Sequence, residues 1–96
     1  MLTFERNTGI KLRLIGEYVL TELGDEIIAC SVDESTPRII TLNETGVVLW
    51  RLLEKGCSED ELITSLCDEF DVTETQARND VFAFIDTLHS SRIITY

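Results

Sequence analysis

The hydrophobic pattern of this chain changes its repeat once, directly after Leu42. Before that residue, short β-favouring runs alternate with turn residues; after it, apolar side chains recur three and four positions apart as far as residue 89. A repeat of two residues is typical of half-buried strands, whereas a repeat of about 3.6 residues is typical of amphipathic helices. We therefore expect an α+β fold in which a small antiparallel sheet precedes a group of helices.

Three strands are expected in the N-terminal half of the chain. Residues 18–23 and 26–32 are β-favouring runs joined by Gly24-Asp25, and glycine at the first central position favours a type II′ hairpin turn. The polar residues 33–37 then interrupt the pattern, and residues 38–42 resume it as a third strand. The sequence thus predicts a three-stranded antiparallel sheet.

Weaker β signals lie at the two ends of the chain. Residues 10–15 alternate apolar and basic side chains, which predicts either a short strand or an extended arm. The β-prone residues 92–96 are expected to pack back as a terminal strand. With 96 residues, 44% of them apolar, the chain is long enough for one domain with one modest core. We divide it into residues 1–16, an N-terminal arm or extra strand, and residues 17–96, the main domain.

The first two helices have recognisable starts. The first is expected to follow Asn43 or Thr45 as its N-cap and to stop at Gly56. The second begins with the S-x-x-E pattern of a capping box at Ser58 and ends near Asp71. The apolar residues at core spacing are Gly46, Leu49, Trp50 and Leu53 in the first helix, and Leu62, Ile63, Leu66 and Phe70 in the second.

A third helix, over about residues 74–89, has an apolar arc wider than one core contact needs. A T-x-x-Q pattern beginning at Thr73 marks its start. On a helical wheel, Val81, Phe84 and Leu88 lie within about 40° of Ala77, and the four form a core stripe. A second stripe beside it consists of Arg78, Phe82, Ile85 and His89. Two interpretations stay open: the second stripe lines a groove, or Phe82 and Ile85 complete the core.

The third strand, Arg38 to Leu42, is a candidate edge of the sheet. An exposed edge offers unpaired N–H and C=O groups, on which an extended peptide can add as a further strand. A groove beside such an edge would be a peptide-binding arrangement; the alternative is an edge covered by another part of the chain.

The charge of the chain argues against nucleic acid as a partner. Eight basic residues stand against 18 acidic ones, a formal net charge of −10, whereas duplex binding depends on Lys and Arg that neutralise phosphates. Within residues 74–89, Arg78 is the only Lys or Arg. No apolar run approaches the ~20 residues that span a bilayer, and the first residues lack a secretion signal, so we expect a cytoplasmic protein without membrane contact.

Residue patterns of catalysis are missing from the sequence. There is one histidine, and neither a nucleophile elbow nor a phosphate-binding glycine loop is present. A metal site would need Cys30, Cys57, Cys67 and His89 to converge from four separate elements, and the odd cysteine count argues against a disulfide framework. We expect a protein that is not an enzyme and that carries neither a metal ion nor another cofactor.

The junction between sheet and helices resembles a known family. The run Ile40-Thr41-Leu42-Asn43-Glu44-Thr45-Gly46, followed by Leu49-Trp50, is similar to the L-N-x-T-G-x-x-x-W signature of the PqqD-like family. The similarity continues through Ser58-x-x-Glu61-Leu62 and Asp80-Val81-x-x-Phe84-Ile85, and it covers roughly residues 17–96.

This resemblance implies a fold, a function and a site. The fold is a winged helix-turn-helix lookalike, with three strands followed by three helices. The function is to bind the leader of a ribosomally synthesised precursor peptide and to present it to a separate modifying enzyme, such as a radical S-adenosylmethionine enzyme, a peptidase or a cyclase. The implied peptide-binding residues are Arg38, Ile39, Ile40, Thr41 and Leu42 on the strand, and Arg78, Phe82, Ile85 and His89 on the third helix.

Other functions remain open at the level of sequence. The chain could be a structural subunit that docks on a modifying enzyme without touching peptide, or a winged-helix DNA-binding regulator, although its charge argues against the latter. The exposed strand could also pair with that of a second copy and form a homodimer.

Overall fold

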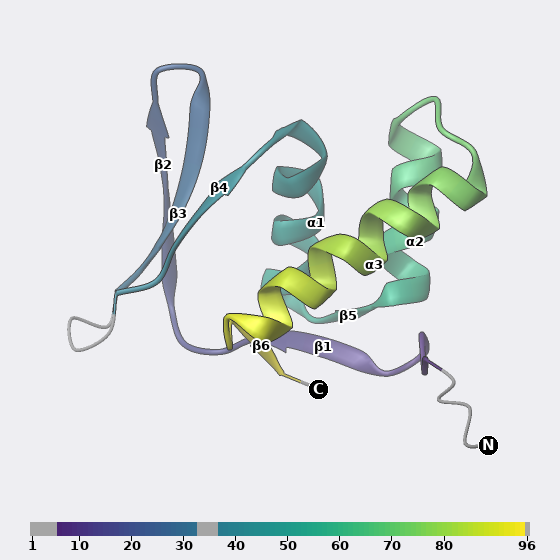
Figure 1. Ribbon diagram of the computed structural model, residues 1–96, viewed down its shortest axis with the longest axis horizontal. Helices are drawn as coiled ribbons and strands as arrows, with labels where there is room; N and C mark the ends of the chain where they lie inside the picture. The colour runs from purple at the N-terminus through teal and green to yellow at the C-terminus, as the bar shows by residue number, and fades with distance from the viewer. Residues whose placement is uncertain (1–5, 33–36, 96) are drawn as a thin grey trace.

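The computed structural model describes residues 6–32 and 37–95, which form two small sheets and three helices (Figure 1). A hairpin and a third strand lie on one side of the molecule, and the helices lie on the other. The elements are β1 Lys11–Leu14, β2 Tyr18–Leu23, β3 Glu26–Ser31, β4 Ile39–Leu42, α1 Glu44–Lys55, β5 Cys57–Ser58, α2 Glu59–Glu69, α3 Glu74–Ser90 and β6 Ile94–Thr95.

The larger sheet has the strand order β2-β3-β4 and is antiparallel throughout. This arrangement confirms the three strands expected from the sequence. Gly24 has a φ of 65°, a left-handed conformation that the first central position of a type II′ turn requires. Leu23 and Glu26 face each other across the two-residue loop. Within the described residues β4 pairs with β3 alone, so its other side is a free edge of the sheet.

Hydrogen bonding between β3 and β4 determines which backbone groups of β4 point to that free edge. Ser31 N donates to Arg38 O at 2.9 Å, so these two residues form a hydrogen-bonded pair. Such pairs recur every second residue, and Ile40 is therefore bonded to β3 opposite Ala29. It follows that the N–H and C=O groups of Ile39 and Thr41 point away from β3.

The smaller sheet has the order β5-β1-β6 and ties the two ends of the described chain together. Where the sequence allowed a strand or an arm, the structure has the strand β1, in which Lys11 faces Ser58 and Arg13 faces Thr95. The C-terminal strand also forms as expected, and Ile93 and Ile94 just ahead of the chain end are buried.

Local capping explains where the helices begin. Asn43 Oδ1 accepts a hydrogen bond from Gly46 N at 2.7 Å, which selects Asn43 as the N-cap of α1. Ser58 and Glu61 form a complete capping box at α2. At α3 only half of the expected capping box is present. Thr73 accepts a hydrogen bond from Gln76 N, but the Gln76 side chain donates to Asp80 at 2.9 Å.

A single core fills the space between the helices and the inner faces of both sheets. Trp50 of α1 is 1% exposed, and its ring meets that of Tyr18 edge to face at a centroid distance of 5.1 Å. Among the described residues, no helix is long and apolar enough to cross a membrane. The buried apolar residues are Leu12, Ala29, Leu42, Leu49, Trp50, Leu53, Cys57, Leu62, Ile63, Leu66, Ala77, Val81, Ile85, Leu88, Ile93 and Ile94.

Candidate functional site

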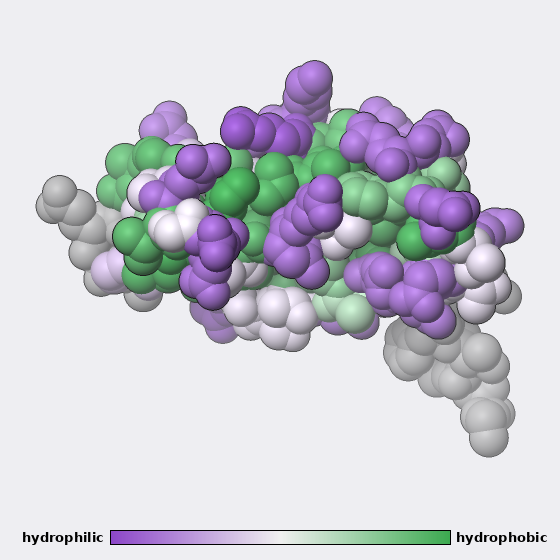
Figure 2. All heavy atoms as spheres, turned by 90° about the horizontal axis from the view of Figure 1, so that it is seen from above, coloured by the Kyte–Doolittle hydropathy of each residue, from purple (hydrophilic) through white to green (hydrophobic). Residues whose placement is uncertain are grey.

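A groove runs between the free edge of β4 and one side of α3. It consists of two adjoining cavities of about 470 Å³ and about 320 Å³, which share Asn43, Phe84 and Thr87. Hydrophobic atoms bordered by hydrophilic side chains are visible on the face that carries the hairpin turn and the start of α1 (Figure 2). We call this the β4–α3 groove; it is lined by Asp25, Glu26, Ile40, Thr41, Leu42, Asn43, Thr45, Gly46, Leu49, Asp80, Ala83, Phe84 and Thr87.

The strand wall of the groove comes from the segment that the sequence singled out. Side chains alternate along it: Ile39 and Thr41 are exposed, Arg38 and Ile40 are half-buried, and Leu42 is buried in the core. The described edge thus offers backbone groups at Ile39 and Thr41 and apolar surface at Ile40.

The helix wall consists of Asp80, Ala83, Phe84 and Thr87. Phe84 is half-buried and packs against the core, so part of its ring contributes to the groove surface. Asp80, Ala83 and Thr87 are exposed. The groove therefore combines one aromatic ring with small and acidic side chains.

The second stripe of α3 is not part of this wall, which corrects the expected geometry. Ile85 is 1% exposed and belongs to the core. Phe82 forms cation–π contacts with two guanidinium groups. The Cζ atom of Arg6 is 4.1 Å and that of Arg78 is 5.8 Å from its ring centroid. His89 follows Phe82 by two helical turns and is on the same side of α3.

The directions of Phe84 and Phe82 follow from the position of the buried residues of α3. The buried residues of α3 are Ala77, Val81, Ile85 and Leu88, so the centre of the buried arc lies near Val81. Phe84 and Phe82 lie on opposite sides of this buried arc. The side of α3 with Phe84 faces β4, and the side with Phe82 faces the N-terminal segment.

Arg6 fastens that N-terminal segment to the helices. Its guanidinium forms ion pairs with Glu59 at 2.6 Å and Asp86 at 2.9 Å, and Glu59 is only 2% exposed. Desolvation by burial works to lower the pKa of Arg6, but hydrogen bonds to Glu59 and Asp86 outweigh it, and the pKa is raised overall. The contact joins residues 53 positions apart.

All the charged side chains that line the groove are acidic. Asp25 and Glu26 come from the hairpin turn and the start of β3, and Asp80 comes from α3. Arg78, one of the peptide-binding residues that the family resemblance implied, lies on the other side of α3 and forms an ion pair with Glu74 at 3.0 Å. Sequence reasoning missed Asp80 and Phe84 as groove residues because no local pattern tells which neighbour each side of a helix faces.

Two further features bear on chemistry in the part of the chain that the structure describes: metal ligands and a buried thiol. No group of three or more His, Cys, Asp and Glu residues could hold a metal ion there. Burial, followed by the nearby Glu61 carboxylate, raises the pKa of Cys57 to about 11, against a smaller opposing effect of Lys11. The Cys57 thiol is therefore protonated at neutral pH, and a protonated thiol is a poor nucleophile.

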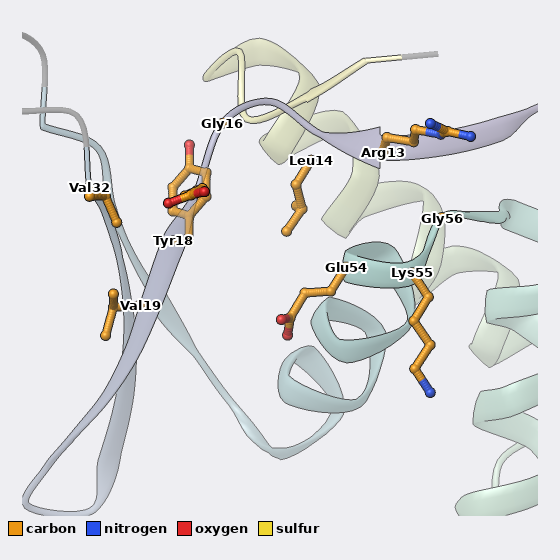
Figure 3. A pocket seen from close by; sticks show the side chains of 10 residues that line it. Arg13, Leu14, Gly16, Tyr18, Val19, Val32, Glu54, Lys55 and Gly56 are labelled. Carbon is orange, nitrogen blue, oxygen red and sulfur yellow. The ribbon is translucent and has the colours of Figure 1, made fainter.

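A separate cavity of about 510 Å³ lies between the β1–β2 connection and the end of α1 (Figure 3). Val19 and Val32 stand on its sheet side and Glu54 and Lys55 on its helix side. The Tyr18 hydroxyl is buried without a hydrogen-bond partner among the described residues. This cavity shares no lining residue with the β4–α3 groove.

Comparison with known proteins agrees with this architecture. The lasso peptide synthetase B1 complexed with the leader peptide has a TM-score of 0.71 and 21% identity, covering 91% of this chain and 100% of that chain. TbiB1 in complex with the TbiA(beta) leader peptide has a TM-score of 0.68 and 22% identity, covering 85% and 93%. No curated protein matches significantly.

The family comparison covers nearly the whole chain. The model described as coenzyme PQQ synthesis protein D (PqqD) matches residues 1–94. The L-N-x-T-G-x-x-x-W run through which the sequence resembles this family contains Asn43, the N-cap of α1. This protein belongs to the PqqD family.

Proposed function

We propose that this chain binds the leader segment of a ribosomally synthesised precursor peptide in the β4–α3 groove and presents it to a separate modifying enzyme. One observation carries the proposal: the free edge of β4 opens onto a groove whose far wall is the Phe84 side of α3. A single extended peptide can satisfy the edge and fill the groove at once.

Backbone pairing supplies the sequence-tolerant part of this binding. The outward N–H and C=O groups of Ile39 and Thr41 are two donors and two acceptors at alternate positions. A peptide strand laid against them forms the hydrogen bonds that a fourth strand of the sheet would form. Binding by the backbone sets the path of the leader without requiring a fixed sequence.

Side-chain alternation then supplies selectivity. Leader residues opposite Ile39 and Thr41 point to the outer face of the sheet, whereas the residue opposite Ile40 points inward. The inward residue meets the apolar surface of Ile40 and the ring of Phe84. We therefore expect leaders with an apolar residue at this inward position.

The comparisons support this proposal. Both similar solved structures are described as complexes with leader peptides, and both share the fold over most of this chain. The family model adds a match over residues 1–94. In this account the chain performs no chemistry; a radical S-adenosylmethionine enzyme, a peptidase or a cyclase modifies the presented peptide.

The outer face of the larger sheet is suited to contact such an enzyme. Val19, Cys30 and Ile39 lie in one row across the three strands, and Val19 and Ile39 are 55% and 67% exposed. Val32 continues this apolar face. Because a leader strand on β4 would extend the row, the enzyme would contact the sheet and the leader together.

A matched pair of substitutions tests leader binding. Phe84 and Phe82 are both half-buried phenylalanines of α3, on opposite sides of the helix. Fluorescence anisotropy with the labelled leader of any small precursor peptide encoded beside this chain should show a loss of affinity for Phe84→Ala and near wild-type affinity for Phe82→Ala. Thermal unfolding of both variants checks that the fold is retained. Equal affinities for wild type and both variants would contradict the proposal.

The same experiment separates the alternatives. A subunit that only docks on the enzyme would bind the enzyme without saturable binding of the leader. A homodimer formed through β4 would use the same free edge, so the leader would dissociate the dimer. Val19→Lys, on the outer face, should leave leader affinity unchanged and weaken binding to the modifying enzyme, because it places a charge in the apolar row.

A further inference from the structure

We infer that the β4–α3 groove selects leader peptides that carry Lys or Arg in the segment that lies along the groove. This inference rests on the proposed function and adds the chemical class of the ligand.

The charges around the groove all have one sign and come from three separate elements. Asp25 lies in the hairpin turn, Glu26 begins β3, and Asp80 is on the second turn of α3. All three are exposed at the groove, and one polar partner of Asp80 is the neutral side chain of Gln76 at 2.9 Å. None of them is in an ion pair with another described residue.

The basic side chains that form ion pairs in the described chain lie outside the lining of the groove. Arg6, Lys11, Arg51 and Arg78 are paired with carboxylates of the helices, outside the groove. No described Lys or Arg side chain lines either cavity of the groove. Arg38, which precedes β4 on the same face as Ile40, lines neither cavity. A peptide in the two cavities therefore meets negative charge without a cation in their lining.

The start of α1 also lines the groove and by itself favours an anion, because helix N-termini carry partial positive charge. In this protein, side chains of the chain itself already interact with the N-terminus of α1. The Asn43 side chain accepts from Gly46 N at 2.7 Å, and Glu44 stands in the first turn. The net charge of the side chains that line the groove thus stays negative.

Geometry places these carboxylates where a peptide side chain can meet them. Phe84 and Thr87 belong to both cavities, so an inward side chain of a peptide strand beside Ile40 enters a space that Asp25, Glu26 and Asp80 line. Long Lys and Arg side chains can lay their apolar stems along Phe84 while the charge reaches a carboxylate. A leader with an apolar residue and a basic residue on its inward side fits both parts of the groove.

A selection from random peptides tests the inference independently of any particular leader sequence. The probe is an mRNA-displayed library of random peptides of about 12 residues, longer than the ~5–6 residues of an ordinary strand. It is selected on the immobilised full chain and on the variant Asp25→Asn/Glu26→Gln/Asp80→Asn. The matched control is Asp68→Asn/Glu69→Gln/Asp71→Asn, which removes the same charge from exposed positions at the end of α2.

The expected result is an enrichment of Lys and Arg among peptides selected on the wild type and on the control, and none on the groove variant. The best selected peptide should lose roughly three- to tenfold in affinity on the groove variant, since each exposed ion pair contributes little. Added salt should weaken its binding to the wild type.

Two contrary results have different meanings. Peptides that bind and depend on Phe84 but show no excess of Lys and Arg, or lose equal affinity on both triple variants, would overturn the charge preference alone. Peptides that bind without dependence on Phe84, or no saturable binding at all, would overturn the proposed function and this inference with it.

Discussion

At the scale of single residues, binding depends on which backbone groups of β4 are already used. Ile40 is bonded to β3, whereas the N–H and C=O groups of Ile39 and Thr41 are directed to the free edge. Proline removes one donor and is tolerated in edge strands where the lost N–H does not belong to the ladder. Position 41 thus allows one hydrogen bond to be removed from the proposed interface without opening the sheet.

We predict that Thr41→Pro lowers leader affinity roughly three- to tenfold, the effect of losing one hydrogen bond. Thr41→Val, which keeps the N–H and the branched shape, is the control and should bind like the wild type. Anisotropy titration measures the affinities, and urea unfolding shows whether the sheet is intact. Unchanged affinity for Thr41→Pro would mean that the leader does not pair with β4.

Cys57 provides a test of the core that depends on pH. Burial raises its pKa from 9.0 to about 11, so the folded state keeps a proton that the unfolded chain loses above about pH 9. Its contribution is full below pH 9 and is lost as pH rises towards 11, about 2–3 kcal/mol in total. Between about pH 8 and pH 10.5, the wild type should lose more unfolding free energy than Cys57→Ala. Parallel losses in urea titrations would contradict the raised pKa.

Residue-level prediction from the sequence succeeded where the signal was local. The glycine of the hairpin turn and the caps at Asn43 and Ser58 follow from side chains within three residues of the backbone groups they serve. It failed at Phe84 and Ile85, because a helical wheel gives the angle between two side chains and not the direction of β4. The wheel put Phe84 in the core stripe and Phe82 in the stripe that could line a groove, whereas Phe84 is the one that faces β4.

At the scale of elements, the N-terminal segment is held by one buried carboxylate. Glu59 is 2% exposed at the first turn of α2, and Arg6 reaches it from across the molecule. Thr8 O also accepts a hydrogen bond from Asp60 N at 3.1 Å. No sequence pattern predicts such a pairing, since its partners lie far apart in the chain and share no element.

We predict that Arg6→Met lowers the unfolding free energy by about 3 kcal/mol, because it leaves the Glu59 carboxylate buried without its partner. The double variant Arg6→Met/Glu59→Gln should recover most of this loss, since no unpaired charge remains. Urea unfolding of the two variants and the wild type measures both effects. A loss for the single variant that the second substitution does not reduce would show that the arginine acts through packing on Phe82 instead.

At the scale of the whole molecule, two surfaces meet at β4. The groove lies on the inner side of the strand, and the apolar row with Val19 and Ile39 lies on the outer side of the same sheet. A strand added at the edge would be part of both surfaces. The sequence predicted the order of strands and helices, because periodicity and caps are local, but these two surfaces arise only when the elements are packed.

The central claim is that a leader peptide becomes the next strand of the sheet. Amide hydrogen exchange, resolved by residue with NMR, tests it most directly on the free and the leader-bound protein. We predict that the amides of Ile39 and Thr41 exchange rapidly in the free protein and become protected on binding, while Ile40 is protected in both states. Leader binding that leaves the exchange of Ile39 and Thr41 unchanged would contradict strand addition and place the peptide elsewhere on the molecule.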